Sequence, residues 1–95
     1  MKHCILVKWN SLVINKEEIL IKVKAVFDKL NGFDGVKNVS YFQNIIDRPN
    51  RYDLMICIEM DKSFLEIYDS SQPHLEWKQN FGKFVENKAI FDYEE

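Results

Sequence analysis

The sequence predicts an α+β fold with the element order β-α-β-β-α-β and a four-stranded antiparallel sheet. Three observations support this prediction: segments of alternating apolar residues, a segment with apolar residues at helical spacing, and helix-start signals further along the chain. No linker rich in proline, glycine or serine divides the sequence. The 95 residues therefore predict a single domain, residues 1–95.

The first element is predicted to be a strand over His3–Trp9. Its side chains alternate between two faces, and both faces carry apolar groups. This alternation is typical of a strand.

A helix follows this strand. Asn15 is a suitable N-cap with Glu18 three residues later, and Ile14 and Ile19 stand at the positions of a hydrophobic staple. Gly32 is expected to end the helix in the left-handed conformation. The apolar stripe of this helix is formed by Ile19, Val23, Val26 and Leu30.

Two strands and a turn come next. The segment 35–44 predicts the second strand, and the turn cluster 47–50 separates it from a third strand, Tyr52–Met60. Because the third strand is almost entirely apolar, we expect it to be central.

The second helical region is predicted to be broken. A short helix is expected over 61–70, and Pro73 opens another at its first position, with the break around Ser71-Gln72. A last strand is expected over Lys88–Tyr93. This order is that of the ferredoxin-like fold, in which both helices cover one face of the sheet.

The other face of the sheet, the bare face, is expected to be apolar. Such a patch usually marks an interface, so the sequence predicts a homodimeric α/β barrel closed sheet to sheet. The predicted helix-facing residues are Ile5, Val7, Ile56 and Ile90. The predicted bare-face residues are Cys4, Leu6, Met55, Cys57, Ala89, Phe91 and Tyr93, with Leu6, Met55, Cys57, Phe91 and Tyr93 as the dimer interface.

Composition excludes several classes of function. Thirteen basic and fifteen acidic residues give a net charge of −2, without the basic excess that nucleic-acid binding requires. The apolar runs are too short to span a membrane and no signal peptide is present, so a cytoplasmic protein is expected. Cys4 and Cys57 are expected to be reduced core thiols, and the sequence shows no metal-ligand cluster and no cofactor motif.

Five short motifs resemble those of the stress-responsive dimeric α/β-barrel family, often called Dabb. They are residues 2–8, Gly35-Val36, residues 52–54, Pro73-His74 and residues 91–93. The resemblance covers essentially the whole chain and implies a ferredoxin-like protomer in a dimeric barrel. It also implies a small apolar ligand pocket between helices and sheet, in a family whose members mostly have no established activity. The expected lining is Ile5, Val7, Val23, Val26, Ile56 and Ile90.

The resemblance also implies candidate catalytic residues. In a plant polyketide cyclase of the family, a Tyr and a His six residues later flank an aldol cyclisation, and Tyr68 and His74 keep this separation. A first-strand His of that pattern falls on His3. The sequence departs from the pattern at Ser71, where the family often has another His, and at Pro73, which stands one position late.

The chemistry of these three residues favours acid–base catalysis. A helix N-terminus disfavours a positive charge, so His74 should be neutral and able to accept a proton from an acidic carbon. Tyr68 could hold the resulting oxyanion, and His3 could share the proton. Each residue also has a purely structural interpretation: a helix-start histidine, a core aromatic and a strand histidine.

Two functions therefore remain open. The first is a non-catalytic dimeric barrel, stress-related and binding a small apolar ligand. The second is a cofactor-independent cyclase, lyase or isomerase acting on a carbonyl-containing substrate, with quinol monooxygenase chemistry as a smaller branch. The aromatic residues Trp9, Trp77, Phe81 and Phe84 could line a ligand site, but their spacing favours simple core packing.

Overall fold

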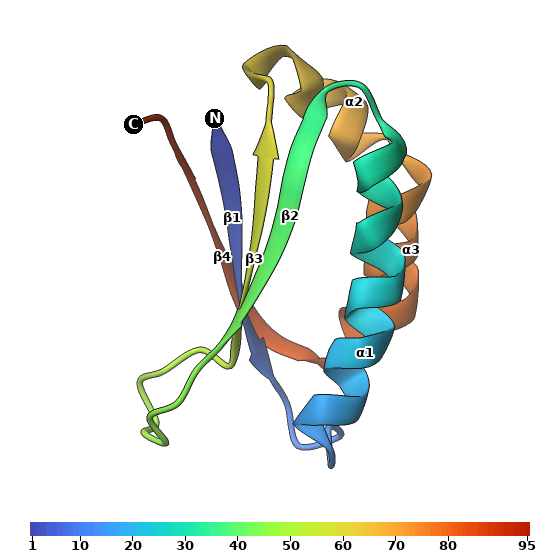
Figure 1. Cartoon of the computed structure of the whole chain (residues 1–95). Helices are drawn as coiled ribbons and strands as arrows, with labels where there is room; N and C mark the ends of the chain where they lie inside the picture. Colours follow the sequence, from blue (N-terminus) through green and yellow to red (C-terminus); the bar gives the residue numbers. More distant parts are fainter.

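A computed structural model describes residues 1–95 and has the predicted order of elements (Figure 1). The strands are β1 (Lys2–Trp9), β2 (Val36–Gln43), β3 (Leu54–Met60) and β4 (Val85–Tyr93). The helices are α1 (Lys16–Phe27), α2 (Leu65–Asp69) and α3 (Gln72–Phe81), with 3₁₀ turns η1 (Asp28–Gly32), η2 (Lys62–Phe64) and η3 (Gly82–Phe84).

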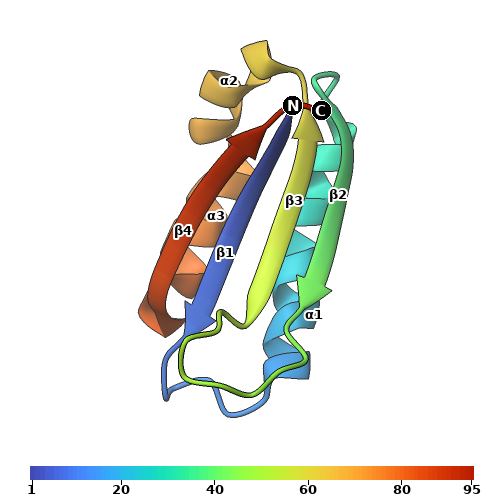
Figure 2. The ribbon, with the colours of Figure 1, turned by 90° about the vertical axis from the view of Figure 1, so that its left-hand side faces the viewer.

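The sheet has the strand order β2-β3-β1-β4, and every neighbouring pair is antiparallel. This topology confirms the predicted α+β, ferredoxin-like fold, with β3 in an interior position. All helices lie on one side of the sheet, and Figure 2 looks onto the side that they leave uncovered. None of the helices is both long enough and apolar enough to cross a membrane.

The hydrophobic core lies between the sheet and the helices. An aromatic cluster belongs to it, in which the Trp77 ring packs edge-on to Trp9 and Phe27 and stacks on Phe81. All four rings belong to the buried core, so the expectation of core packing is confirmed for Trp9, Trp77 and Phe81. Phe84 is half-buried at the edge of the same cluster.

The start and end of α1 test the local sequence signals. Asn15 is the N-cap as predicted, because its side chain accepts a hydrogen bond of 3.0 Å from the backbone N–H of Glu18. The predicted staple is wrong, since Ile14 is 97% exposed. The predicted left-handed Gly32 is also wrong: the helix continues into the turn η1, and no residue of the chain has a positive φ. The tighter 3₁₀ hydrogen bonds satisfy the end of the helix without a left-handed residue.

Strand register decides which side chains share the bare face. Cys4 pairs with Cys57 and Phe91, and Leu6 pairs with Met55 and Ala89. Because paired residues of neighbouring strands point to the same side, the predicted bare-face set lies together. Phe91 is 64% exposed there, and Phe42 of β2, which the prediction omitted, is 53% exposed.

Candidate functional site

Three elements bring the predicted catalytic residues together. His3 comes from β1, Tyr68 from α2 and His74 from the first turn of α3. The Tyr68 ring packs against both imidazoles, with centroid distances of 5.3 Å to His3 and 4.7 Å to His74. The three side chains therefore form one cluster at the end of the fold where β1 begins and α3 starts.

The hydroxyl of Tyr68 is the unusual group in this cluster. Tyr68 is 1% exposed, and its hydroxyl is the one buried side-chain nitrogen or oxygen without a hydrogen-bond partner. Burial, and secondarily the nearby charge of Asp69, raise the pKa of Tyr68 well above its usual value. The phenol therefore stays protonated at neutral pH and is free to donate a hydrogen bond.

His3 is held by an acidic partner that sequence reasoning missed. Its Nδ1 contacts Asp92 Oδ1, and the two residues face each other across the β1–β4 pair. The His3 side chain is buried, whereas that of Asp92 is 39% exposed. The carboxylate accepts a hydrogen bond from Nδ1–H, so in the neutral ring Nε2 is the nitrogen that can accept a proton. Asp92 is recognised as the partner of His3 only from the register between β1 and β4. The alternation of residues within β4 does not determine that register.

His74 is oriented by the break between α2 and α3. Its Nδ1 lies 2.8 Å from the carbonyl oxygen of Asp69, and because a carbonyl only accepts, Nδ1 must donate. Ser71 caps α3 by accepting from the backbone N–H of His74 at 3.4 Å, and its own hydroxyl donates to the carbonyl of Tyr68 at 2.7 Å. The helix begins at Gln72, so Pro73 occupies its second position, not the predicted first. The free nitrogen of a neutral His74 is therefore Nε2.

Comparison with known proteins identifies the fold. No family model and no curated protein matches the sequence. The structure is similar to a dimeric ferredoxin-like protein of unknown function from Thermobifida fusca, with 16% identity, a TM-score of 0.79, and coverage of 97% of this chain and 87% of the other. The fold is that of the dimeric ferredoxin-like proteins.

Two further solved structures are similar to this chain. A Dabb family protein from Mesorhizobium loti has 16% identity and a TM-score of 0.73, over 99% of this chain and 94% of the other. A hydroxynitrile lyase from Passiflora edulis has 16% identity and a TM-score of 0.76, over 97% and 89%. The expected resemblance to the Dabb proteins is thus confirmed at the level of the ferredoxin-like fold.

The expected apolar lining lies mostly in the core of this ferredoxin-like protomer. Ile5, Val7, Val23, Val26 and Ile56 belong to the buried core, each at most 7% exposed. Ile90 pairs with Ile5 and lies on the helix side, but it is 49% exposed on the edge strand β4. Five of the six residues therefore pack as core, and Ile90 stands outside it.

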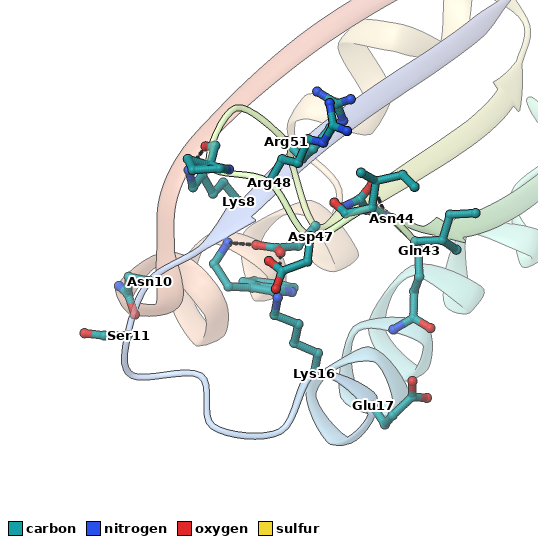
Figure 3. A pocket seen from close by; sticks show the side chains of 15 residues that line it. Lys8, Asn10, Ser11, Lys16, Glu17, Gln43, Asn44, Asp47, Arg48 and Arg51 are labelled. Atoms are coloured by element: carbon teal, nitrogen blue, oxygen red, sulfur yellow. Dashed lines mark hydrogen bonds and ion pairs between the residues drawn. The ribbon is translucent and has the colours of Figure 1, made fainter.

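A polar cleft of about 780 Å³ opens at the opposite end of β1 (Figure 3). It lies between the β1–α1 loop and the β2–β3 loop. Asp53 accepts from the backbone N–H of Trp9 at 2.7 Å and from Lys16 Nζ at 2.9 Å, and Lys8 Nζ donates to the carbonyl of Pro49 at 2.8 Å. These contacts tie the two loops together, which is a structural role.

An apolar cleft of about 870 Å³ lies between the loop before α1 and the end of α3. Val26 borders it, alone among the residues expected to line a ligand pocket. Its other walls include Leu12, Ile19, Phe81 and Phe84. Neither of these two clefts contains His3, Tyr68 or His74.

Proposed function

We propose that this chain is a cofactor-independent acid–base enzyme of the lyase or cyclase class, acting on a small carbonyl-containing substrate. The observation that carries the proposal is the buried, unpaired hydroxyl of Tyr68, whose ring packs against two imidazoles. An unsatisfied buried hydroxyl costs about 1–3 kcal/mol of stability, so its retention points to a partner that arrives with the substrate.

His74, Tyr68 and His3 each have a separate role in the proposed reaction. His74 Nε2 takes a proton from the carbon next to the substrate carbonyl, while its Nδ1 donates to the carbonyl of Asp69. Tyr68 donates a hydrogen bond to the oxygen on which negative charge develops. His74 then returns the proton to the product, while His3, whose Nδ1 is held by Asp92, steers the substrate with its Nε2.

The hydroxynitrile lyase among the solved structures supports the lyase branch of this proposal. Its fold is similar at a TM-score of 0.76, and its name describes a lyase that acts on hydroxynitriles. The support is limited to the class of chemistry, because 16% identity shows the fold alone.

The proposed enzyme is a homodimer that closes through the bare face. Three of the five interface residues, Leu6, Met55 and Phe91, are apolar side chains on neighbouring strands, and Cys57 and Tyr93 complete the set. A large exposed apolar patch is typical of an association surface. Solved structures of this fold are described as dimeric, which supports a dimer.

Proton exchange tests the proposed activity without knowledge of the natural substrate. The protein is incubated in D₂O with a panel of small ketones, β-diketones and enolisable aldehydes, and deuterium uptake is followed by NMR. We expect acceleration over buffer for at least one compound, and a loss of about 10²-fold or more in His74→Gln. A wild-type protein that accelerates none of them would contradict the proposal.

A second candidate is a non-catalytic carrier of a small apolar ligand, and the apolar cleft beside α1 and α3 favours it. Such clefts, with a few polar groups at the rim, are typical ligand sites. Native mass spectrometry of gently purified protein tests this function. Extra mass that disappears on denaturation, and is lost in Phe84→Asp, supports a carrier, whereas a bare protein contradicts it.

A further inference from the structure

Two cysteines face each other across the bare face of the sheet. Cys4 and Cys57 are directly paired in the β1–β3 register, although they lie 53 residues apart in sequence. Both thiols are free, and their Sγ atoms are 2.9 Å apart. The expectation of two separate core thiols did not anticipate this pairing.

We propose that Cys4 and Cys57 are a site of reversible cross-strand disulfide formation, with small thiol disulfides of the glutathione type as the co-reactant. Directly opposed residues of antiparallel strands have Cα atoms about 4.5–5.5 Å apart, within the range of about 4.4–6.8 Å that a disulfide spans. A bond of about 2.05 Å requires the sulfurs to approach by less than 1 Å from their present separation.

The surroundings of the two thiols set the order of the reaction. Cys57 is partly exposed, so it meets the co-reactant, whereas Cys4 is 5% exposed. Burial and the hydrogen bond with Cys57 raise the pKa of Cys4 to about 12, which makes it a poor attacking group by itself. Cys57 is therefore the attacking thiol, and Cys4 is the resolving thiol.

The exchange balances in two steps. The Cys57 thiolate attacks one sulfur of the small disulfide, which forms a mixed disulfide and releases one small thiolate. Cys4 then loses its proton to solvent and attacks the Cys57 sulfur, which releases the second small thiolate. The two protein thiols are oxidised to one disulfide, and one small disulfide is reduced to two thiols.

The bond would form at the centre of the surface proposed for dimerisation. Cys4 also pairs with Phe91 on β4, so the cysteine pair lies among the apolar side chains of that face. Oxidation therefore changes the packing at the middle of this surface. We place the reaction in the dissociated protomer, where Cys57 is reachable.

Intact mass spectrometry of the native chain tests this proposal. The reduced protein is diluted until sedimentation shows single protomers, and is then treated with oxidised glutathione. We expect the loss of two hydrogens from the wild-type mass, a peptide that links Cys4 to Cys57, full reversal by dithiothreitol, and a rise in Tm of roughly 10 °C in the oxidised form.

Two variants separate the roles of the cysteines. Cys4→Ser should accumulate a mixed disulfide on Cys57 because no thiol resolves it, and Cys57→Ser should stay unmodified at the buried Cys4. A wild-type chain that stays reduced, or that keeps the glutathione adduct as Cys4→Ser does, would overturn the proposal. If either variant fails to fold, the formation or absence of the Cys4–Cys57 disulfide in the wild type is enough to decide between the two outcomes.

Discussion

Tyr68 combines two properties that proteins rarely place together, namely near-complete burial and an unpaired hydroxyl. A phenylalanine would fill the same space without the cost of an unsatisfied donor. Its aromatic neighbours are the rings of His3 and His74, which are proton-transfer groups. At the scale of single residues, the protein therefore has a group better suited to binding an oxygen than to stabilising the core.

Tyr68→Phe should retain or increase stability. The substitution removes an unsatisfied hydroxyl, so the free energy of unfolding should rise by up to about 1 kcal/mol in urea denaturation. Tyr41→Phe is the matched control, because the Tyr41 hydroxyl donates to Asp28 Oδ1 at 2.7 Å and its removal should cost about 1 kcal/mol. Equal losses in the two variants would show that the Tyr68 hydroxyl has a partner in the free protein.

The raised pKa of Tyr68 predicts a loss of stability at alkaline pH. The folded chain keeps the phenol proton, whereas the unfolded chain releases it near pH 10, so this contribution is complete below about pH 10 and falls as the pH rises further. Urea denaturation of wild type and Tyr68→Phe between pH 9 and pH 11 measures the difference. The wild-type slope should be steeper, by up to about 1.4 kcal/mol per pH unit, and parallel slopes would contradict the assignment.

At the scale of elements, the break between α2 and α3 determines the geometry of the site. Ser71 is bonded to Tyr68 at the end of α2 and to His74 at the start of α3. One serine therefore sets the position of two proposed catalytic residues. The broken helix was predictable because Pro73 follows a stretch of polar residues, but the double role of Ser71 depends on distances that a sequence pattern does not contain.

Two helix caps provide a test of this role. Asn15→Ala and Ser71→Ala each remove an N-cap and should each cost about 1 kcal/mol of the free energy of unfolding. Only Ser71→Ala should also lower the exchange rate, because His74 then loses its fixed orientation. Equal rates in the two variants would mean that the cap acts on stability alone.

At the scale of the whole molecule, alternation within strands and the order of elements were enough to predict the ferredoxin-like topology and the bare face. Individual contacts and the burial of single side chains were harder to predict, because they depend on the register between strands and on how far the helices extend over the sheet. Asp92 reaches His3 only through the β1–β4 register, and Ile90 is exposed although its neighbour Ile5 is buried. The packing of Val23 and Ile56 also depends on how closely the layers approach, which periodicity does not measure.

The proposed dimer is testable through the most exposed aromatic residue of the bare face. Phe91→Glu places a charge where the two copies meet, so sedimentation velocity should show a dimer for the wild type and a monomer for the variant. Ile14→Glu is the control, because Ile14 is 97% exposed on the loop before α1, away from the bare face. A monomeric wild type would contradict the barrel.

The central claim is that the Tyr68 hydroxyl is kept for the substrate oxygen, and the exchange rate of Tyr68→Phe tests it most directly. With the panel compound that the wild type accelerates most, we predict a drop of about 10²–10³-fold in the exchange rate, as expected for loss of an oxyanion donor. The folded fraction of the variant should remain unchanged in the same sample. An undiminished exchange rate in Tyr68→Phe would show that the hydroxyl takes no part in the chemistry.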